Sequence, residues 1–531
     1  MPAALILLPI ALLLVFGAAP LLTLALPWLA PVEGGSDEIG RQLLASGDVY
    51  PLLANSLGLA LCTAALATAV GILPGVALGR ASLRFKPAWC ILFALPLLLP
   101  AVFTAAGWQP WAALWRAAAG PGPVAGFVGA WLVLTLVTFP LPLYFTALAL
   151  RRTDGALEDL ARLQSRPRQA MRYLIFGLAR PGIALAWLLV FVLALSETKV
   201  PALFGLETYQ GRLAELALEG EGHLAGAAAL PLVVAAIVVA VAEAQLFGER
   251  GVAFLARTTR LEIRPLPLRW GGVPAHLLLA ILALASLGLP LMGWAVALRQ
   301  EGEMTAAAAV AATWNAGGPA FARSLVFALA GGSLAALVGL PLAYAAERKR
   351  VPGRRAVDLL LVVLFVVPGT VLASGLLRLV PAELFRLSAA ALVIAFGVHF
   401  AVVPYRMERV ALRQLGTRLE EAGMLSGAPW SARTSRLLLP LNAESLAAVW
   451  AIAVILAFRD GDLGAALSPA ARTLAALGEI ASASPVALAA LSLVAAALSA
   501  GVMVVAALLI LLLDRAGRSS AAPAPVVARA R

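Results

Sequence analysis

The sequence has 531 residues and a formal net charge of +12, but 62% of its residues are apolar and only 13% are charged. Soluble domains contain about 25% charged residues, so this composition excludes an ordinary water-soluble enzyme or binding module. Apolar runs of about twenty residues recur along the chain and indicate a helical protein that crosses a membrane many times. The arginines lie in short loops between these runs, which argues against a nucleic-acid partner.

Twelve candidate spans follow one another along the chain. They cover residues 4–29, 52–79, 88–110, 123–149, 181–204, 226–247, 273–297, 322–346, 357–378, 387–411, 441–465 and 487–513. Arginines follow every even-numbered span, whereas the segments after the first, fifth and seventh spans are acidic. The positive-inside rule therefore places the basic loops and both termini in the cytoplasm.

An internal repeat relates the two parts of the sequence. Residues 55–72 align without gaps on 323–340 at an offset of 268, and residues 141–167 align on 403–429 at an offset of 262. The two parts have the same topology, so we expect parallel halves related by a pseudo-two-fold axis along the membrane normal. The first register continues over Pro100 with Pro368 and Gly107 with Gly375.

This repeat predicts a division of the chain into two six-span halves. The first half covers 1–247, a cytoplasmic linker covers 248–272, the second half covers 273–515, and a cytoplasmic tail covers 516–531.

Catalytic motifs are not found in the sequence. It has no phosphate-binding GxxxxGK[ST] loop, no HExxH, no GxSxG and no CxxC. Ionisable side chains in mid-span, the usual mark of ion-coupled transport, are nearly absent. We predict His399 to be a packed, hydrogen-bonded residue rather than a ligand. Transport against a gradient would therefore draw its energy from a partner.

A short polar segment between the tenth and eleventh spans indicates where that partner binds. It follows the spacing E-A-G-x₃-G-x₉-L-x-L-P from Glu421 to Pro440. This resembles the cytoplasmic EAA loop of binding-protein-dependent ABC importer permeases, E-A-A-x₃-G-x₉-I-x-L-P. The fused arrangement of two halves is similar to the ferric-iron and thiamine permeases of that family. A degenerate copy of the loop lies at about 151–178, and the closer copy at about 413–440.

The resemblance implies an all-α integral membrane fold with twelve transmembrane helices in two parallel six-helix repeats, the type I importer permease fold. It implies a permease in the bacterial inner membrane that passes a small solute, ferric iron first and thiamine second, to the cytoplasm. The partners would be a periplasmic solute-binding protein and two ATP-binding cassette subunits, which form a homodimer. ATP and magnesium would be bound by those subunits, so this chain itself would be no enzyme and hold no cofactor. An ion-coupled secondary transporter is the alternative from another class.

The two loops supply the candidate residues for ATPase coupling. Acids in a first helical turn suit the positive end of the helix dipole, and we expect Gly423 and Gly427 to form one bare strip on a helix face. Pro429 would end or turn that helix, and Pro440 would mark entry to the next span. The coupling residues are Glu158, Asp159, Ala161, Ser165 and Pro167 in the first loop and Glu420, Glu421, Ala422, Gly423, Gly427, Pro429 and Pro440 in the second.

A second group of charged residues lies near the predicted outer ends of the fifth and eleventh spans. The aligned halves place Glu197, Thr198 and Lys199 opposite Arg459, Asp460 and Gly461. The charged members Glu197, Lys199, Arg459 and Asp460 would line an outer gate or be ordinary interfacial charges. Pro100 and Pro368 would mark kinks beside the pore or packing features, since membrane helices tolerate proline. No metal site is expected.

Overall fold

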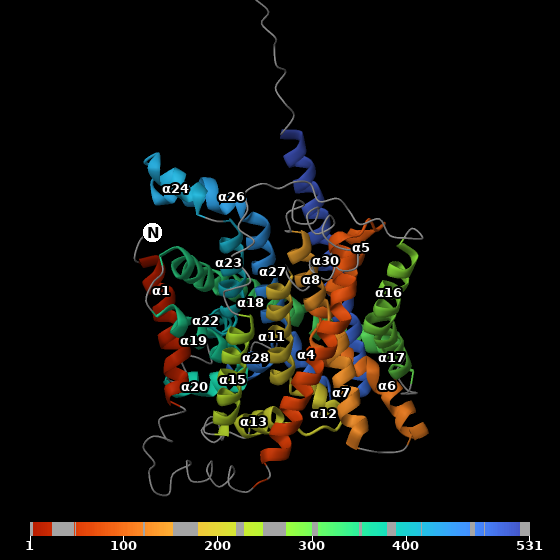
Figure 1. Ribbon diagram of the computed structural model, residues 1–531. Helices are drawn as coiled ribbons and strands as arrows, with labels where there is room; N and C mark the ends of the chain where they lie inside the picture. The colour runs from red at the N-terminus through yellow and green to blue at the C-terminus, as the bar shows by residue number, and fades with distance from the viewer. Residues whose placement is uncertain are drawn as a thin grey trace, which may run out of the picture.

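A computed structural model shows how the helices are arranged (Figure 1). The structure describes residues 4–23, 47, 49–119, 123–151, 179–218, 228–247, 272–299, 306–349, 353–379, 389–415, 417–467, 473–482 and 484–520. Within these ranges the chain consists of α-helices, π-helical turns (η) and short connections. The predicted all-α class is confirmed.

The helices keep the labels of Figure 1. In the predicted first half they are α1 (Ala4–Leu13), η1 (Leu14–Ala18), α4 (Val49–Arg80), α5 (Lys86–Leu98), α6 (Ala101–Ala119), α7 (Pro123–Thr138), α8 (Pro140–Arg151), α11 (Arg180–Ser196), α12 (Lys199–Leu203), α13 (Tyr209–Leu218) and α15 (Leu230–Phe247). In the predicted second half they are α16 (Val273–Ala283), η6 (Leu284–Gly288), α17 (Leu289–Ala297), α18 (Ala306–Tyr344), η7 (Ala345–Lys349), α19 (Arg354–Val366), α20 (Gly369–Leu379), α22 (Ala389–His399), α23 (Val402–Leu415), α24 (Arg418–Leu425), α25 (Trp430–Arg433), η8 (Thr434–Leu438), α26 (Leu439–Leu441), α27 (Ala443–Arg459), α28 (Asp462–Leu467), α29 (Leu474–Ala481) and α30 (Pro485–Ser520).

Most of the predicted spans coincide with apolar helices. Among the described residues, 6 helices are long and apolar enough to cross a membrane, or up to 10 if each bent helix pair is one span. The other two predicted spans contain the shorter apolar helices Gly182–Ser196 and Leu230–Val239. The chain is therefore a multi-pass helical membrane protein, and the number twelve stays a prediction.

Two of the bent spans are broken at a proline. α5 and α6 meet at Pro100 with a bend of 92°, and α19 and α20 meet at Pro368 with a bend of 106°. The preceding residues Leu99 and Val367 are extended, with ψ of 134° and 132°, because a proline ring disfavours helical backbone in the residue before it. Both prolines therefore mark kinks.

Equivalent residues of the two predicted halves make matching close contacts. A Cβ built on Gly71 of α4 would lie 2.7 Å from the carbonyl oxygen of Phe139, and one built on Gly339 of α18 would lie 2.7 Å from that of Ala401. These residues are related by the same two offsets, 268 and 262, as the aligned segments. The contacts are those that a repeat predicts.

The first span of each predicted half packs on the third span of the other half. A Cβ on Gly107 of α6 would lie 2.5 Å from the Pro290 backbone of α17, and one on Gly375 of α20 would lie 2.7 Å from the carbonyl oxygen of Pro20. The indole nitrogen of Trp294 also donates to the carbonyl oxygen of Phe103 at 2.9 Å. This exchange of first spans holds the two halves together.

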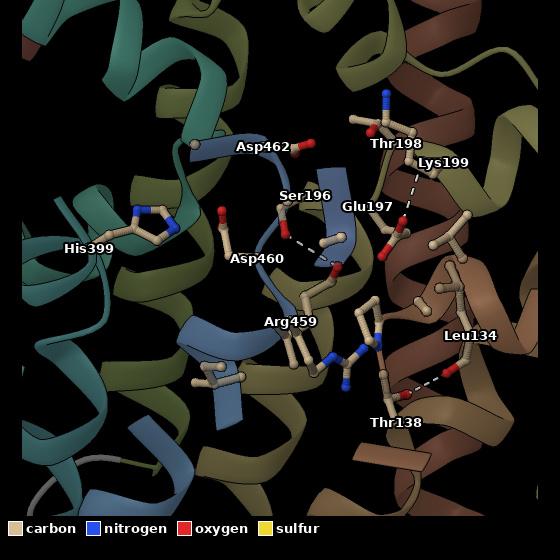
Figure 2. Close-up of a pocket in the computed structure, with 18 of the residues that line it drawn as sticks. Leu134, Thr138, Ser196, Glu197, Thr198, Lys199, His399, Arg459, Asp460 and Asp462 are labelled. Atoms are coloured by element: carbon tan, nitrogen blue, oxygen red, sulfur yellow. Dashed lines mark hydrogen bonds between the residues drawn. The ribbon is translucent and has the colours of Figure 1, made fainter. Parts of the chain in front are cut away.

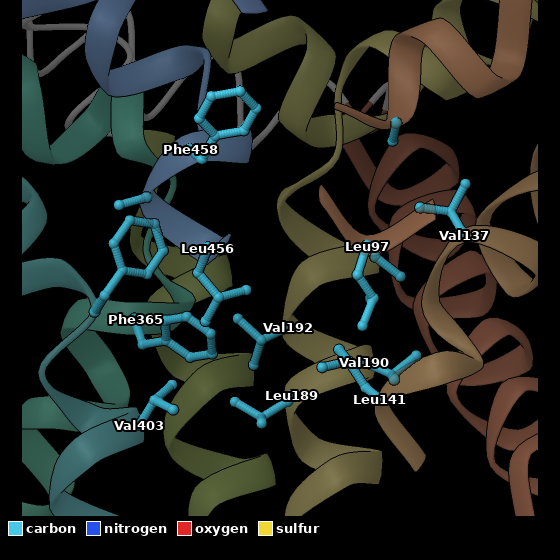
Figure 3. Close-up of a cluster of buried hydrophobic side chains, with 14 of the residues drawn as sticks. Leu97, Val137, Leu141, Leu189, Val190, Val192, Phe365, Val403, Leu456 and Phe458 are labelled. Atoms are coloured by element: carbon cyan, nitrogen blue, oxygen red, sulfur yellow. The ribbon is translucent and has the colours of Figure 1, made fainter. Parts of the chain in front are cut away.

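Buried apolar side chains from both halves form the core between them (Figure 3). Val192 of α11, Phe365 of α19 and Leu456 of α27 are all buried members of this cluster. The loop helix α24 stands apart from this core at one end of the bundle, whereas α12, α13 and α20 lie toward the other end (Figure 1).

We expect the substitution Gly107→Ala to lower the midpoint of thermal unfolding in detergent. The added methyl group would meet the Pro290 backbone at 2.5 Å, and overpacking of this kind costs about 1–3 kcal/mol. Gly318→Ala in α18 is the matched control, because a Cβ there meets nothing within 4 Å and alanine favours a helix. Equal midpoints for the two variants would contradict the close approach of α6 and α17.

Candidate functional site

The segment from Thr417 to Asn442 forms a helical hairpin that contains the closer EAA-like loop. Its outgoing arm is α24, and its return arm is α25, η8 and α26. Glu420 and Glu421 lie in the first turn of α24, where unpaired backbone N–H groups favour negative charge. A bend of 76° then separates the return arm from α27.

A glycine in left-handed backbone conformation ends α24. Gly427 has a φ of +76°. The N–H of Ala428 donates to the carbonyl oxygen of Gly423 at 3.0 Å, and the N–H of Gly427 donates to that of Met424 at 3.0 Å. These two hydrogen bonds form a Schellman motif, which satisfies carbonyl groups at the end of the helix.

The predicted glycine strip is therefore wrong. Gly427 lies beyond the helix, and a Cβ on Gly423 would lie 3.1 Å from Cδ of Arg433 and 3.4 Å from Cδ1 of Leu437. Gly423 thus admits the return arm of the hairpin rather than a partner surface. Pro429 does not end α24 but precedes α25 as its N-cap residue. Pro440 lies in α26, just before the bend into α27.

The two acids of the loop point to different surroundings. Glu420 is only 5% exposed, and its Oε1 accepts a hydrogen bond from Nε of Arg348 at 2.6 Å. The hydroxyl of Tyr344 donates to its Oε2 at 3.1 Å. Glu421 and Ala422 are exposed. Sequence reasoning grouped the two acids, whereas the structure makes Glu420 an internal anchor and leaves Glu421 exposed.

An apolar patch accompanies Glu421 on the outside of the hairpin. Leu425, the last residue of α24, is 91% exposed, and Met424 is 53% exposed. Figure 1 shows α24 at the tip of the molecule, away from the helices that form the core. Met424 and Leu425 thus form an exposed apolar surface beside the carboxylate of Glu421.

The degenerate loop of the first half contains the other candidate coupling residues. Its candidate residues Glu158, Asp159, Ala161, Ser165 and Pro167 lie outside the described residues. Their role in coupling stays a prediction.

A polar cavity lies between the two predicted halves (Figure 2). It encloses about 90 Å³, and its walls include both Pro100 and Gly369 at the kinks of the two broken spans. All four residues predicted for an outer gate line it. Its charged lining residues are Glu197, Lys199, Arg459, Asp460 and Asp462.

Two carboxylates end helices at equivalent places in this cavity. Glu197 follows α11 with ψ of 121°, and Asp460 follows α27 with ψ of 120°. Oε1 of Glu197 accepts from the N–H of Lys199 at 3.3 Å, and Oδ1 of Asp460 accepts from the N–H of Leu463 at 2.9 Å. The predicted alignment of Glu197 with Arg459 is thus wrong by one residue. Asp460 is the residue equivalent to Glu197, because each of these two carboxylates follows the last residue of its helix.

Arg459 brings a guanidinium group to the cavity. Among the described residues its buried Nη1 has no hydrogen-bond partner, although the charge of Glu197 attracts the guanidinium. Figure 2 shows this guanidinium between Glu197 and Thr138. Since Glu197 comes from the first half and Arg459 from the second, their attraction acts across the boundary between halves.

Sequence reasoning missed His399 as a lining residue. This side chain is 4% exposed and packs against the rings of Phe365 and Phe400, as predicted for a core histidine. However, it lines the cavity near Asp460 (Figure 2), and in the described part of the chain its Nδ1 has no hydrogen-bond partner. No local sequence signal marks it, because the other lining residues are distant in the chain.

The donor groups of the cavity do not converge on a metal site. Within the described part of the chain, no group of three or more His, Cys, Asp or Glu side chains is arranged to hold a metal ion. The charged side chains that line the cavity are thus of both signs.

The chain is thus a multi-pass helical membrane protein whose helices pack around a cavity with charged lining residues and whose α24 hairpin is exposed at one end. A comparison with curated proteins identifies a particular relative, the "Fe(3+)-transport system permease protein FbpB 2" of Haemophilus influenzae. The two sequences are 24% identical over 449 residues, which cover 81% of this chain and 84% of that protein. The similarity confirms the resemblance to ferric-iron permeases of the ABC importer class. No family profile and no solved structure matches the chain.

We expect Gly427→Ala to destabilise the end of α24, because a left-handed backbone costs a residue with a Cβ about 1–2 kcal/mol. Hydrogen exchange at the Gly427 and Ala428 amides should become faster, since both N–H groups belong to the Schellman motif. Gly427→Asn is the matched control, because asparagine tolerates this conformation better. Equal protection in the wild type and Gly427→Ala would contradict this role for the glycine.

Proposed function

We propose that this chain is the transmembrane subunit of an ATP-driven importer that receives ferric iron from a periplasmic binding protein and passes it to the cytoplasm. The observation that carries the proposal is the exposed hairpin of α24, whose spacing resembles the ATPase-coupling loop of such permeases. The similarity to an Fe(3+)-transport permease supports both the class and the substrate. The chain itself would supply the path, and its partners the energy.

The hairpin would bind an ATP-binding cassette subunit through its exposed residues. Leu425 and Met424 offer apolar side chains, and Glu421 offers a charge beside them. A second cassette subunit would bind the loop of the first half, in which Glu158 and Asp159 remain but Ser165 replaces the usual glycine. Closure of the two subunits on ATP would then move both loops and switch the spans between inward- and outward-open states.

The polar cavity would form part of the solute path. Carboxylate oxygens are hard ligands that suit a highly charged cation. Glu197, Asp460 and Asp462 bring three carboxylate groups to the cavity. Conduction requires sites weak enough to release the ion, which agrees with lining acids that do not converge. Arg459 and Lys199 would limit the residence of a cation by repulsion.

We expect Leu425→Glu to prevent copurification of the chain with the ATP-binding cassette subunits of its own organism. Leu425 is 91% exposed, so the change should not disturb folding, while loss of an interface anchor costs at least about 2 kcal/mol. Phe85→Glu is the matched control, because Phe85 is also a highly exposed apolar residue in a predicted cytoplasmic loop. Full recovery of the complex with Leu425→Glu would contradict docking at α24.

We expect Glu197→Gln to lower uptake of radiolabelled Fe(3+) in a deletion strain by about tenfold. This loss, about 1.4 kcal/mol, is smaller than the interaction energy of ~4 kcal/mol between two unit charges 4 Å apart near a protein surface. Glu207→Gln is the control, because Glu207 is exposed and does not line the cavity. Copurification with the ATPase should be unchanged in both variants.

Two outcomes would overturn parts of this proposal. Unchanged iron uptake by a well-expressed Glu197→Gln variant would remove the cavity from the solute path. Uptake of thiamine instead of iron by the wild type would replace the substrate.

A further inference from the structure

A cluster of partly buried charges joins the hairpin to the rest of the second half. Each of its pairs links two helices: Oε1 of Glu347 accepts from Nε of Arg409 at 2.8 Å and from Nη2 of Arg413 at 2.7 Å. Asp358 of α19 accepts two hydrogen bonds from Arg406 of α23, at 3.1 and 3.2 Å. These pairs fasten the ends of α18, α19 and α23 to one another.

Glu420 connects α24 to this cluster. The ion pair between Glu420 and Arg348 has side-chain exposures of only 7% and 10%, respectively. Nη2 of Arg348 also donates to the carbonyl oxygen of Leu412 in α23 at 2.9 Å. Arg348 therefore joins three elements, its own η7 at the end of α18, α24 and α23.

An aromatic contact strengthens the same junction. The ring of Trp430 in α25 packs edge-on against Tyr344 at 6.4 Å between centroids, and the Tyr344 hydroxyl donates to Glu420. Both arms of the hairpin thus touch the end of α18. A buried ion pair with several hydrogen bonds holds its partners in one geometry, because each charge is costly to leave unpaired.

The covalent route from α24 to the following span is more easily deformed. It passes through Gly427 in left-handed conformation, the π-helical turn η8 and the bend of 76° before α27. Backbone breaks of this kind are where helices bend. A displacement of α24 would therefore reach α18 and α23 through Arg348 more directly than it reaches α27 along the chain.

The interior of the same helix contacts a neighbour of the cavity. Phe321 of α18 packs edge-on against Phe458 of α27 at 5.2 Å between ring centroids, and Phe458 precedes the cavity residue Arg459. Residues 321 and 348 are separated by about 40 Å along a helix at ~1.5 Å per residue. The part of α18 from Phe321 onward, with η7, thus links the hairpin to Phe458, the residue before the cavity residue Arg459.

We propose that Glu420 and Arg348 are positioning residues that transmit movement of the hairpin to the cavity through α18. The inference rests on the proposed function, because it assumes that an ATPase moves α24. The sequence repeat places Arg80 opposite Arg348 and Glu158 opposite Glu420 at the offsets of 268 and 262. Arg80 is buried at the end of α4, while Glu158 lies outside the described residues.

The test compares Glu420→Ala with Asp358→Asn in the complete complex, reconstituted with its ATPase subunits and iron-loaded binding protein. Glu420→Ala should keep the ATPase bound, since docking uses the exposed residues, but iron transported per ATP hydrolysed should fall about tenfold, within the ~5–150-fold range of coupling between sites. Asp358→Asn removes a charge from the same cluster without touching α24, and should keep that ratio even where it lowers the thermal midpoint.

Two further variants separate transmission from simple stability. The charge exchange Glu420→Arg with Arg348→Glu should recover part of the transport-to-hydrolysis ratio, and Glu420→Gln, which keeps the size of the side chain, should give an intermediate ratio. A wild-type ratio in both Glu420→Ala and Glu420→Gln would overturn the inference, as would an equal fall in Asp358→Asn. Failure of the wild-type chain to bind any ATPase subunit would instead overturn the proposed function.

Discussion

Backbone polar groups that leave a helix inside an apolar protein must find partners within the chain. After α11 and α27, this requirement is met by carboxylates, because Glu197 and Asp460 accept hydrogen bonds from the helices that follow. At Pro100 and Pro368 fewer hydrogen-bond partners are needed, because proline has no backbone N–H. Residues at all four breaks line or adjoin one cavity. The polar cavity is therefore the place where broken helices of both predicted halves satisfy their ends.

The same requirement governs the charges near the hairpin. Buried arginines and acids are costly unless they are paired, so the ends of α18, α19 and α23 can carry them only as a shared cluster. Glu420 joins that cluster, and this occupies one of the two adjacent acids of α24. Glu421 remains outside with Leu425. The burial of Glu420 thus divides a short polar sequence into an internal anchor and an exposed surface. It also links the proposed docking site to α18, which contacts Phe458 beside the cavity residue Arg459.

Particular residues show how far the sequence could predict these features. The breaks at Pro100 and Pro368 were predictable, because proline restricts the residue before it whatever its surroundings. The residue equivalent to Glu197 in the second half was predicted one position too early, as Arg459 instead of Asp460. Apolar sequences can be aligned without any residue that marks where each helix ends. The strip expected from Gly423 and Gly427 failed because helical spacing was assumed past Leu425, where Gly427 adopts left-handed backbone instead. His399 gave no signal, since only folding brings it to Asp460.

By itself, the sequence determined the all-helical membrane class and the positions of the apolar helices, because hydropathy and proline act through local physics that needs no partner. It also carried the resemblance to ferric-iron permeases, which the similarity to a curated permease confirms. Only the tertiary structure decided which charges are buried, which first span packs on which half, and that Glu420 is held by Arg348. These depend on contacts between residues far apart in the chain, and the free energy of burying a charge is set by whichever partner the fold places beside it.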